Sequence, residues 1–221
     1  MFKNFFVPSP DAVRVKICGV TTAGDAAAVA AAGADAIGLV FYPPSKRFVR
    51  LPAALTWLRD CPPGLARVAL LVNAPLEEAE AVLGTGEIDA VQLHGDETLS
   101  YCARLSKLGK PVIKALRVRD RTVLTQVSNH PSVAFLLDAY TPGAYGGSGL
   151  TFDWRWLAEL RVPFILSGGL TPENVHTAVR TGRPFAVDVS SGVESSPGKK
   201  DPDLVARFVA QARLARSRQG S

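Results

Sequence analysis

Cysteine is scarce in this sequence, and its spacing excludes two common uses. The chain of 221 residues holds only Cys18, Cys61 and Cys102, which lie far apart and form no CxxC pair. An odd number of widely spaced cysteines argues against a disulfide framework, and the lack of clustered thiols argues against a zinc site. We therefore expect a reduced, cytoplasmic setting and no bound metal.

Long apolar runs are also missing. None reaches about 18 residues, so the sequence predicts no transmembrane helix and no membrane partner. The first stretch, MFKNFFVPSPDAV, has one lysine and is broken by Pro8 and Pro10, so it lacks the apolar core of a signal peptide. We interpret residues 1–12 as a flexible N-terminal leader, 13–216 as one folded catalytic domain and 217–221 as a frayed C-terminal tail.

Charge is modest and evenly spread. The net charge is +5, and the basic residues do not cluster with aromatic ones. Only the C-terminal RLARSRQGS forms a short basic patch. This distribution does not predict nucleic-acid binding. Two interpretations of the net positive charge remain. It is either scattered surface charge or a means of attracting an anionic small-molecule substrate.

Short apolar segments alternate with longer ones rich in alanine, leucine and glutamate. The short segments have the composition and length of β-strands. They span residues 13–19, 36–42, 66–73, 89–94, 111–117, 133–138, 163–167 and 185–189. Eight strands alternating with helices in about 210 residues predict a parallel sheet closed as a single (β/α)₈ TIM barrel. An open Rossmann-type sheet is the alternative, but no GxGxxG follows the first strand.

Helix signals lie between most of these strands. Thr22 and Thr171 are the predicted N-caps of two helices, and glycines end several of them. The helical segments span 21–35, 74–86, 96–110, 171–182 and 201–216. The fifth and sixth barrel helices are weakly signalled, and residues 139–152 are expected to form a long glycine-rich loop.

Polar residues stand where the predicted strands end, and barrel enzymes place their catalytic groups there. Cys18 ends the first strand and Asp138 the sixth, Arg47 follows the second, and Gln92 and His94 share a face of the fourth. A carboxylate that ends a buried run needs a partner or a purpose, and capping of the next loop is the structural alternative for Asp138. His94 is equally explained by ligand contact or by hydrogen bonds to its neighbours.

The loops after the seventh and eighth strands predict a phosphate site. The first contains Gly168 and Gly169 just before a predicted helix, and the second contains Ser190, Ser191 and Gly192. Backbone N–H groups at a glycine-rich helix N-terminus bind anions, and barrels often hold a substrate phosphate after these two strands. Tight βα turns without a ligand are the alternative. Asp188, directly before the second loop, is expected to orient it or to bind substrate.

Lys16 and Cys18 lie on the same face of the first strand, because successive side chains of a strand alternate. A lone cysteine is often a small buried hydrophobic residue. A neighbouring ammonium, however, lowers a thiol's pKa and makes the thiolate available as base or nucleophile. Lys16 itself is a candidate substrate-binding residue, either supporting this thiolate or forming a Schiff base.

Six motifs together resemble the phosphoribosylanthranilate isomerase family, barrel enzymes of tryptophan biosynthesis. They follow in family order from residue 13 to about 210: VKICGVT, GADAIGLVFYPPSKRFV, VQLHGDE, LLDAYTPGAYGGSGLTFDW, LSGGLTPENV and PFAVDVSSGVESSPGKKD. The resemblance implies an Amadori rearrangement of N-(5-phospho-β-D-ribosyl)anthranilate to 1-(2-carboxyphenylamino)-1-deoxy-D-ribulose 5-phosphate, without a cofactor, in a monomer or homodimer.

The resemblance also implies residue roles. Cys18 would be the general base, Asp138 the general acid and Arg47 the residue that binds the anthranilate carboxylate, with phosphate on the glycine and serine loops. An acid must protonate the furanose oxygen, so Asp138 would have to carry a proton, while a thiolate of near-neutral pKa suits the base. The competing interpretations are indole-glycerol-phosphate synthase, a ribulose-phosphate epimerase, and a barrel that binds a phosphosugar without turnover.

Overall fold

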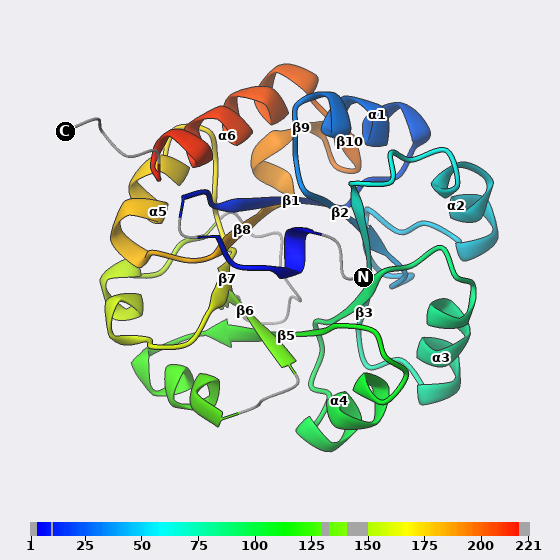
Figure 1. Cartoon of the computed structure of the whole chain (residues 1–221), viewed down its shortest axis with the longest axis horizontal. Coiled ribbons are helices and arrows are strands. Elements are labelled where there is room, and N and C mark those ends of the chain that lie inside the picture. Colours follow the sequence, from blue (N-terminus) through cyan, green and yellow to red (C-terminus); the bar gives the residue numbers. More distant parts are fainter. Residues whose placement is uncertain (1–3, 10, 130–132, 141–149, 217–221) are drawn as a thin grey trace.

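Eight parallel strands close into a barrel, which confirms the predicted fold class (Figure 1). The computed structural model describes residues 4–9, 11–129, 133–140 and 150–216. Each strand pairs with the next, and β1 pairs with β8. The strands are β1 Arg14–Cys18, β2 Ala36–Val40, β3 Ala66–Leu71, β4 Ala90–Leu93, β5 Val112–Val118, β6 Val133–Ala139, β7 Phe164–Leu166 and β8 Ala186–Val189. All eight lie within a residue or two of the predicted segments.

Helices form a ring outside the barrel (Figure 1). They are α1 Ala23–Ala31, α2 Leu51–Leu58, α3 Leu76–Gly84, α4 Leu99–Ser106, α5 Val175–Gly182 and α6 Pro202–Leu214. The Thr22 side chain caps α1, as the sequence predicts. The prediction of Thr171 as N-cap is wrong, because residues 172–174 form a turn and α5 begins at Val175 after Asn174. Within the described residues, no helix combines the length and apolar character needed to cross a membrane.

Two places in the ring hold 3₁₀ helices instead of α-helices. They are η2 Arg121–Asn129, after β5, and η3 Trp154–Glu159, before β7. Their segments gave only weak helix signals, and 3₁₀ helices serve as connectors between regular elements. Helix α2 was not predicted, and its N-cap residue Arg50 makes no side-chain capping bond. Residues 141–149 of the expected glycine-rich loop, and the tail 217–221, lie outside the described residues.

The two faces of each strand pack into different parts of the core. On β1, Val15 and Ile17 face outward and pack with the helices in the large apolar cluster. Lys16 and Cys18 lie on the inner face, as the alternation of side chains predicts. At the N-terminal end the barrel interior is filled by a separate cluster of mostly small and branched side chains, which includes Ala36, Ala66, Val68, Ala90, Ile113 and Leu136.

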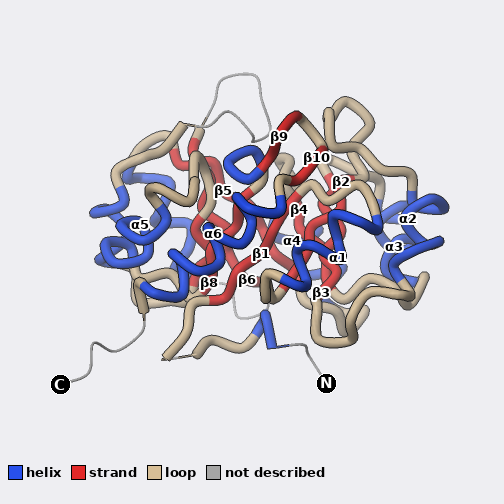
Figure 2. Tube along the Cα trace, turned by 90° about the horizontal axis from the view of Figure 1, so that it is seen from above, coloured by secondary structure: helices blue, strands red, loops and turns tan. Residues whose placement is uncertain are grey.

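Part of the predicted leader plugs the end of the barrel. Residues Asn4–Phe6 form the short helix η1, which lies across the end of the barrel next to the N label in Figures 1 and 2. Phe5 is fully buried in the interior cluster, with its ring centroid 6.5 Å from that of Phe185. This packing adds to the interpretation of residues 1–12 as a leader, because the aromatic ring of Phe5 seals apolar surface that the barrel end would expose. Residues 1–3 and 10 lie outside the described residues.

A small hairpin stands at the other end of the barrel (Figure 2). Its strands, β9 Glu194–Ser196 and β10 Lys199–Lys200, pair antiparallel and follow the 3₁₀ turn η4 Ser191–Val193. This hairpin was not predicted from the sequence. It brings Glu194 and Lys200 next to the C-terminal end of β8.

Candidate active site

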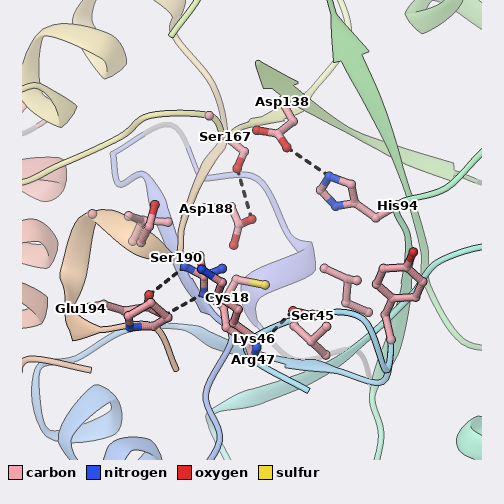
Figure 3. A pocket seen from close by; sticks show the side chains of 18 of the residues that line it. Cys18, Ser45, Lys46, Arg47, His94, Asp138, Ser167, Asp188, Ser190 and Glu194 are labelled. Atoms are coloured by element: carbon pink, nitrogen blue, oxygen red, sulfur yellow. Dashed lines mark hydrogen bonds and ion pairs between the residues drawn. The ribbon is translucent and has the colours of Figure 1, made fainter. Parts of the chain in front are cut away.

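A cavity of about 720 Å³ lies at the C-terminal ends of the strands (Figure 3). Ten of the eleven predicted site residues line it: Cys18, Arg47, His94, Asp138, Gly168, Gly169, Asp188, Ser190, Ser191 and Gly192. Lys16 does not line the cavity and is fully buried beneath it. Residues that are distant in the chain therefore meet at one end of the barrel, where parallel strands and their following loops converge.

Lys16 forms a buried ion pair in the floor of the site. Its Nζ donates to Asp188 Oδ1 at 2.7 Å, and both side chains are at most 5% exposed. A Cβ added to Gly38 would lie 2.7 Å from Cys18 Sγ and 3.0 Å from Lys16 Nζ, so the thiol and the ammonium flank the same glycine. The absence of a side chain at Gly38 is what allows this close approach.

The ionisation of Cys18 differs from the expectation. Burial raises the pKa of the Cys18 thiol, and this outweighs the nearby Lys16 ammonium, which lowers it; Asp188 raises the pKa further. For Lys16, burial lowers the pKa, but Asp188 and Cys18 together raise it above its usual value. This raised pKa does not agree with the expectation of a thiolate of near-neutral pKa. Lys16 acts in the expected direction, but Asp188 offsets part of its charge.

A chain of three buried side chains crosses from β4 to β6. Gln92 Nε2 lies 2.9 Å from His94 Nδ1, and His94 Nε2 lies 3.0 Å from Asp138 Oδ2. Asp138 Oδ1 accepts a hydrogen bond from the Ala139 backbone at 3.0 Å. His94 therefore does make the neighbour contact that the sequence left open, and it does so while lining the cavity (Figure 3).

The positions of the protons in the hydrogen-bonded series Gln92–His94–Asp138 depend on the orientation of the Gln92 side-chain amide. When Gln92 donates its N–H to His94 Nδ1, the imidazole proton sits on Nε2 and is donated to an ionised Asp138. When the amide is reversed, Nδ1 carries the proton and Nε2 accepts a proton from a neutral Asp138. Gln92 Oε1 has no hydrogen-bond partner among the described residues in the first arrangement. These three side chains thus have one hydrogen-bond arrangement for an ionised Asp138 and another for a neutral Asp138.

The loop after β7 is shaped by close backbone contact. Gly168 has φ +87°, and a Cβ there would lie 2.4 Å from the Ala139 backbone nitrogen, so only glycine fits. Asn174 holds the loop from the other side, donating from Nδ2 to Gly169 O and accepting from Thr171 N, each at 2.8 Å. Ser167 Oγ donates to Asp188 Oδ2 at 3.3 Å, which ties this loop to the next strand.

The loop after β8 presents an unused hydroxyl. Ser190 Oγ is buried and has no hydrogen-bond partner within the described part of the chain. Buried polar atoms without partners are uncommon, and a ligand is one explanation for such an atom in a cavity wall. Its loop and the Gly168–Gly169 loop line the same cavity. This arrangement is suited to binding an anionic group.

Arg47 lies on the cavity wall and is paired with Glu194, a partner that was not predicted from the sequence. Arg47 Nε and Nη2 donate to Glu194 Oε1 and Oε2 at 2.8 and 2.7 Å (Figure 3). Lys200 Nζ donates to Glu194 Oε1 at 2.7 Å and to the Ser190 carbonyl at 3.2 Å. A carboxylate and two cations therefore form one connected cluster at the edge of the site.

Comparison with known proteins identifies the family. The family profile of N-(5'-phosphoribosyl)anthranilate (PRA) isomerase matches residues 15–211. The chain belongs to the N-(5'-phosphoribosyl)anthranilate isomerase family. A curated family member from Magnetococcus marinus is 47% identical over 95% of this chain and 99% of its own length. The protein is accordingly an isomerase of this type, an enzyme of tryptophan biosynthesis.

Solved structures of the isomerase family agree in fold. The phosphoribosyl anthranilate isomerase of Thermotoga maritima has a TM-score of 0.85 and 42% identity, covering 91% of this chain and 99% of that one. A second structure, a complex with reduced 1-(o-carboxyphenylamino)-1-deoxyribulose 5-phosphate, has a TM-score of 0.82 and 40% identity, covering 91% of this chain and 99% of that one. That isomerase was therefore captured with a phosphorylated analogue of the reaction's ketose.

Polar residues that support the site, among them Glu194, Lys200, Asn174 and Gln92, were not predicted as site residues. Glu194 and Lys200 lie in the unforeseen hairpin, and Asn174 lies in the turn that was taken for helix. Gln92 was noted only for sharing a face with His94. Its spacing of two residues from His94 was the one available signal, since it places both side chains on the inner face of β4.

Proposed function

We propose that the isomerase reaction runs by acid–base catalysis between Asp138 and Cys18. The observation that carries this proposal is that a carboxyl on β6 and a thiol on β1 line one cavity together with Arg47 and the loops after β7 and β8. Both groups are buried, at 4% and 5% exposure, so water does not compete strongly with substrate for their protons.

The first step uses Asp138 as acid. A neutral Asp138 donates its proton to the furanose oxygen, the bond from that oxygen to the anomeric carbon breaks, and the amino nitrogen's lone pair forms a protonated imine. Asp138 is left ionised, and His94 Nε2 at 3.0 Å can then stabilise it by donating a hydrogen bond. His94 and Gln92 thereby support both states of the acid.

The second step uses Cys18 as base. The thiolate removes the proton from the carbon next to the imine, the electron pair of that C–H bond becomes a carbon–carbon double bond, and the π pair of the imine returns to nitrogen, which gives an enaminol. The enaminol becomes the ketone when the anomeric carbon gains a proton and the hydroxyl on the neighbouring carbon loses its own. Lys16 and Lys200 both favour the thiolate by their charge. The positive charge of the protonated imine favours it further, since an opposite charge nearby stabilises an ionised group. The substrate thus helps to generate the Cys18 thiolate, which burial of this residue disfavours.

Two anchors hold the substrate between the acid and the base. The phosphate is assigned to the loops containing Gly168, Gly169, Ser190, Ser191 and Gly192, supported by the unpartnered Ser190 hydroxyl. The anthranilate carboxylate is assigned to Arg47, whose guanidinium can bind it by charge-assisted hydrogen bonds. Fixing both ends places the sugar in reacting geometry, which is catalysis by positioning.

The remaining assignments are also proposals. Asp188 holds Lys16 and Ser167 in place beneath the sugar rather than transferring a proton. The reaction as written needs no cofactor, metal, nucleic acid or membrane. We keep the cytoplasm as its compartment and a monomer or homodimer as its assembly.

A structure with the reduced ketose phosphate bound tests this map. We expect the phosphate on the 168–169 and 190–192 loops, the carboxylate at Arg47, and the sugar between Cys18 and Asp138. A phosphate bound elsewhere in the cavity would overturn the assignment of both anchors. A correctly placed phosphate with the carboxylate away from Arg47 would overturn the second anchor alone.

A further inference from the structure

The guanidinium of Arg47 is held by one edge only. Glu194 accepts hydrogen bonds from Nε and from one N–H of Nη2. The Nη1 group and the other N–H of Nη2 have no partner among the described residues. Gly19 packs directly against the stem of this arginine, since a Cβ at Gly19 would lie 2.4 Å from Arg47 Cδ. The side chain is therefore fixed in place while its second edge remains available to a ligand.

The charges of the cluster leave a net positive charge. Glu194 is 4% exposed and contacts both Arg47 and Lys200, and Lys200 is itself fully buried at its side chain. One carboxylate between two cations gives a cluster with a single net positive charge, which suits one incoming carboxylate. If Lys200 were absent, Glu194 would neutralise Arg47 and the cluster would have no net attraction for an anion.

Lys200 also connects this cluster to the predicted phosphate loop. Its Nζ donates to the carbonyl oxygen of Ser190 at 3.2 Å while it holds Glu194. The residue assigned to the carboxylate and the loop assigned to the phosphate are thus tied through a single ammonium. This link fixes the separation between the two substrate anchors.

We propose that Glu194, held by Lys200, is a positioning residue that fixes Arg47 by its Nε–Nη2 edge and so presents the other edge to the aromatic carboxylate of the substrate. The proposal rests on the function assigned to Arg47 above. The alternative role of the same contact is competition, in which Glu194 occupies Arg47 and must leave before substrate binds. The two roles predict opposite effects on substrate affinity.

Glu194→Gln separates these roles. The variant cannot accept both guanidinium hydrogen bonds, because one carboxylate oxygen becomes an NH₂ donor. We expect KM for N-(5-phosphoribosyl)anthranilate to rise roughly tenfold or more, the effect of losing a charge-assisted pair, with a smaller change in kcat. The kcat/KM preference for this substrate over N-(5-phosphoribosyl)aniline, which lacks the carboxylate, should fall by a similar factor. Consumption of each substrate is followed by its fluorescence.

The matched control is Glu173→Gln, at an exposed glutamate that also pairs with an arginine, Arg207, at 2.7 Å. We expect its KM and substrate preference to equal those of the parent enzyme. Lys200→Met is the second variant, because it removes the cation behind Glu194 and should weaken the carboxylate preference in the same direction. It keeps the proposal testable if Glu194→Gln does not fold, as judged by thermal unfolding.

Each outcome decides the proposal. A lower KM in Glu194→Gln would establish competition instead of positioning, and an unchanged substrate preference in both variants would also overturn the proposal. Arg47→Met distinguishes this failure from that of the proposed function. If Arg47→Met lowers the carboxylate preference and Glu194→Gln does not, only the positioning role fails. If Arg47→Met also leaves the preference intact, the carboxylate anchor itself is wrong.

Discussion

Replacing Lys16 by methionine perturbs both the stability and the chemistry of the site. The substitution keeps the buried apolar stem and removes the ammonium that Asp188 accepts from at 2.7 Å. The carboxylate, 5% exposed at its side chain, would be left buried without its cation. Removing one partner of a buried pair costs about 3–5 kcal/mol. For a chain of this size, we expect the melting temperature to fall by roughly 6–20 °C.

The same change acts on Cys18. The ammonium and the thiol flank Gly38, so the Lys16 charge acts on the Cys18 thiolate at close range. Because the Lys16 charge stabilises the thiolate, its removal should raise the pKa of Cys18 further above its already raised value. The thiolate absorbance near 240 nm reports this titration, with a Cys18→Ser background subtracted for the other two thiols.

The double variant Lys16→Met, Asp188→Asn is the control for stability. It removes both charges, so most of the lost stability should return, as replacing a whole buried pair is often nearly neutral. The Cys18 pKa should stay higher than in the parent, because Lys16 acts on it more strongly than Asp188. An unshifted Cys18 titration in Lys16→Met would refute the electrostatic account, and an unchanged melting temperature would refute the buried pair.

Three further predictions test other parts of the enzyme. Asp138→Asn should lower kcat by roughly 10²-fold or more with the fold retained, measured by anthranilate fluorescence; near-parental turnover would exclude Asp138 as the acid. The rate of Cys18 alkylation by iodoacetamide, measured by peptide mass spectrometry, should rise with pH. Its midpoint should lie above the ordinary thiol pKa of about 8.5, because burial favours the protonated form. In urea-unfolded protein the midpoint should be lower. Phe5→Ala should cost about 3–5 kcal/mol in urea unfolding while KM is unchanged, and a loss of only a few tenths would show that the plug is loose.

The barrel was predictable because the signals for its strands are local. Apolar runs of strand length recur eight times, and the inner placement of Lys16 and Cys18 follows from side-chain alternation alone. The start of α5 was placed too early because Thr171 and Pro172 carry the pattern of a helix N-terminus. The structure uses these residues for a turn, since Asn174 must reach back to Gly169 O and Thr171 N.

The residues that escaped prediction depend on distant contacts. Glu194 is separated from Arg47 by 147 positions in the chain, and nothing around it marks it as a partner of that arginine. Phe5 precedes two prolines in a segment without periodicity, and only the open end of the barrel explains its burial. The net effect on Cys18 could not be read from sequence either, because it depends on how burial, Lys16 and Asp188 balance. The ends of the strands show which groups converge, whereas the net effect of these groups on a pKa depends on their burial and distances in the folded protein.

Single-turnover kinetics of Cys18→Ser test the central claim most directly. The substitution removes only the sulfur base, so we expect binding of the reduced ketose phosphate to persist while conversion of N-(5-phosphoribosyl)anthranilate slows by roughly 10²-fold or more. Loss of conversion with retained binding would place Cys18 in the proton-transfer step. Near-normal conversion by the folded Cys18→Ser enzyme would contradict the account, and the base would have to be another group in the cavity.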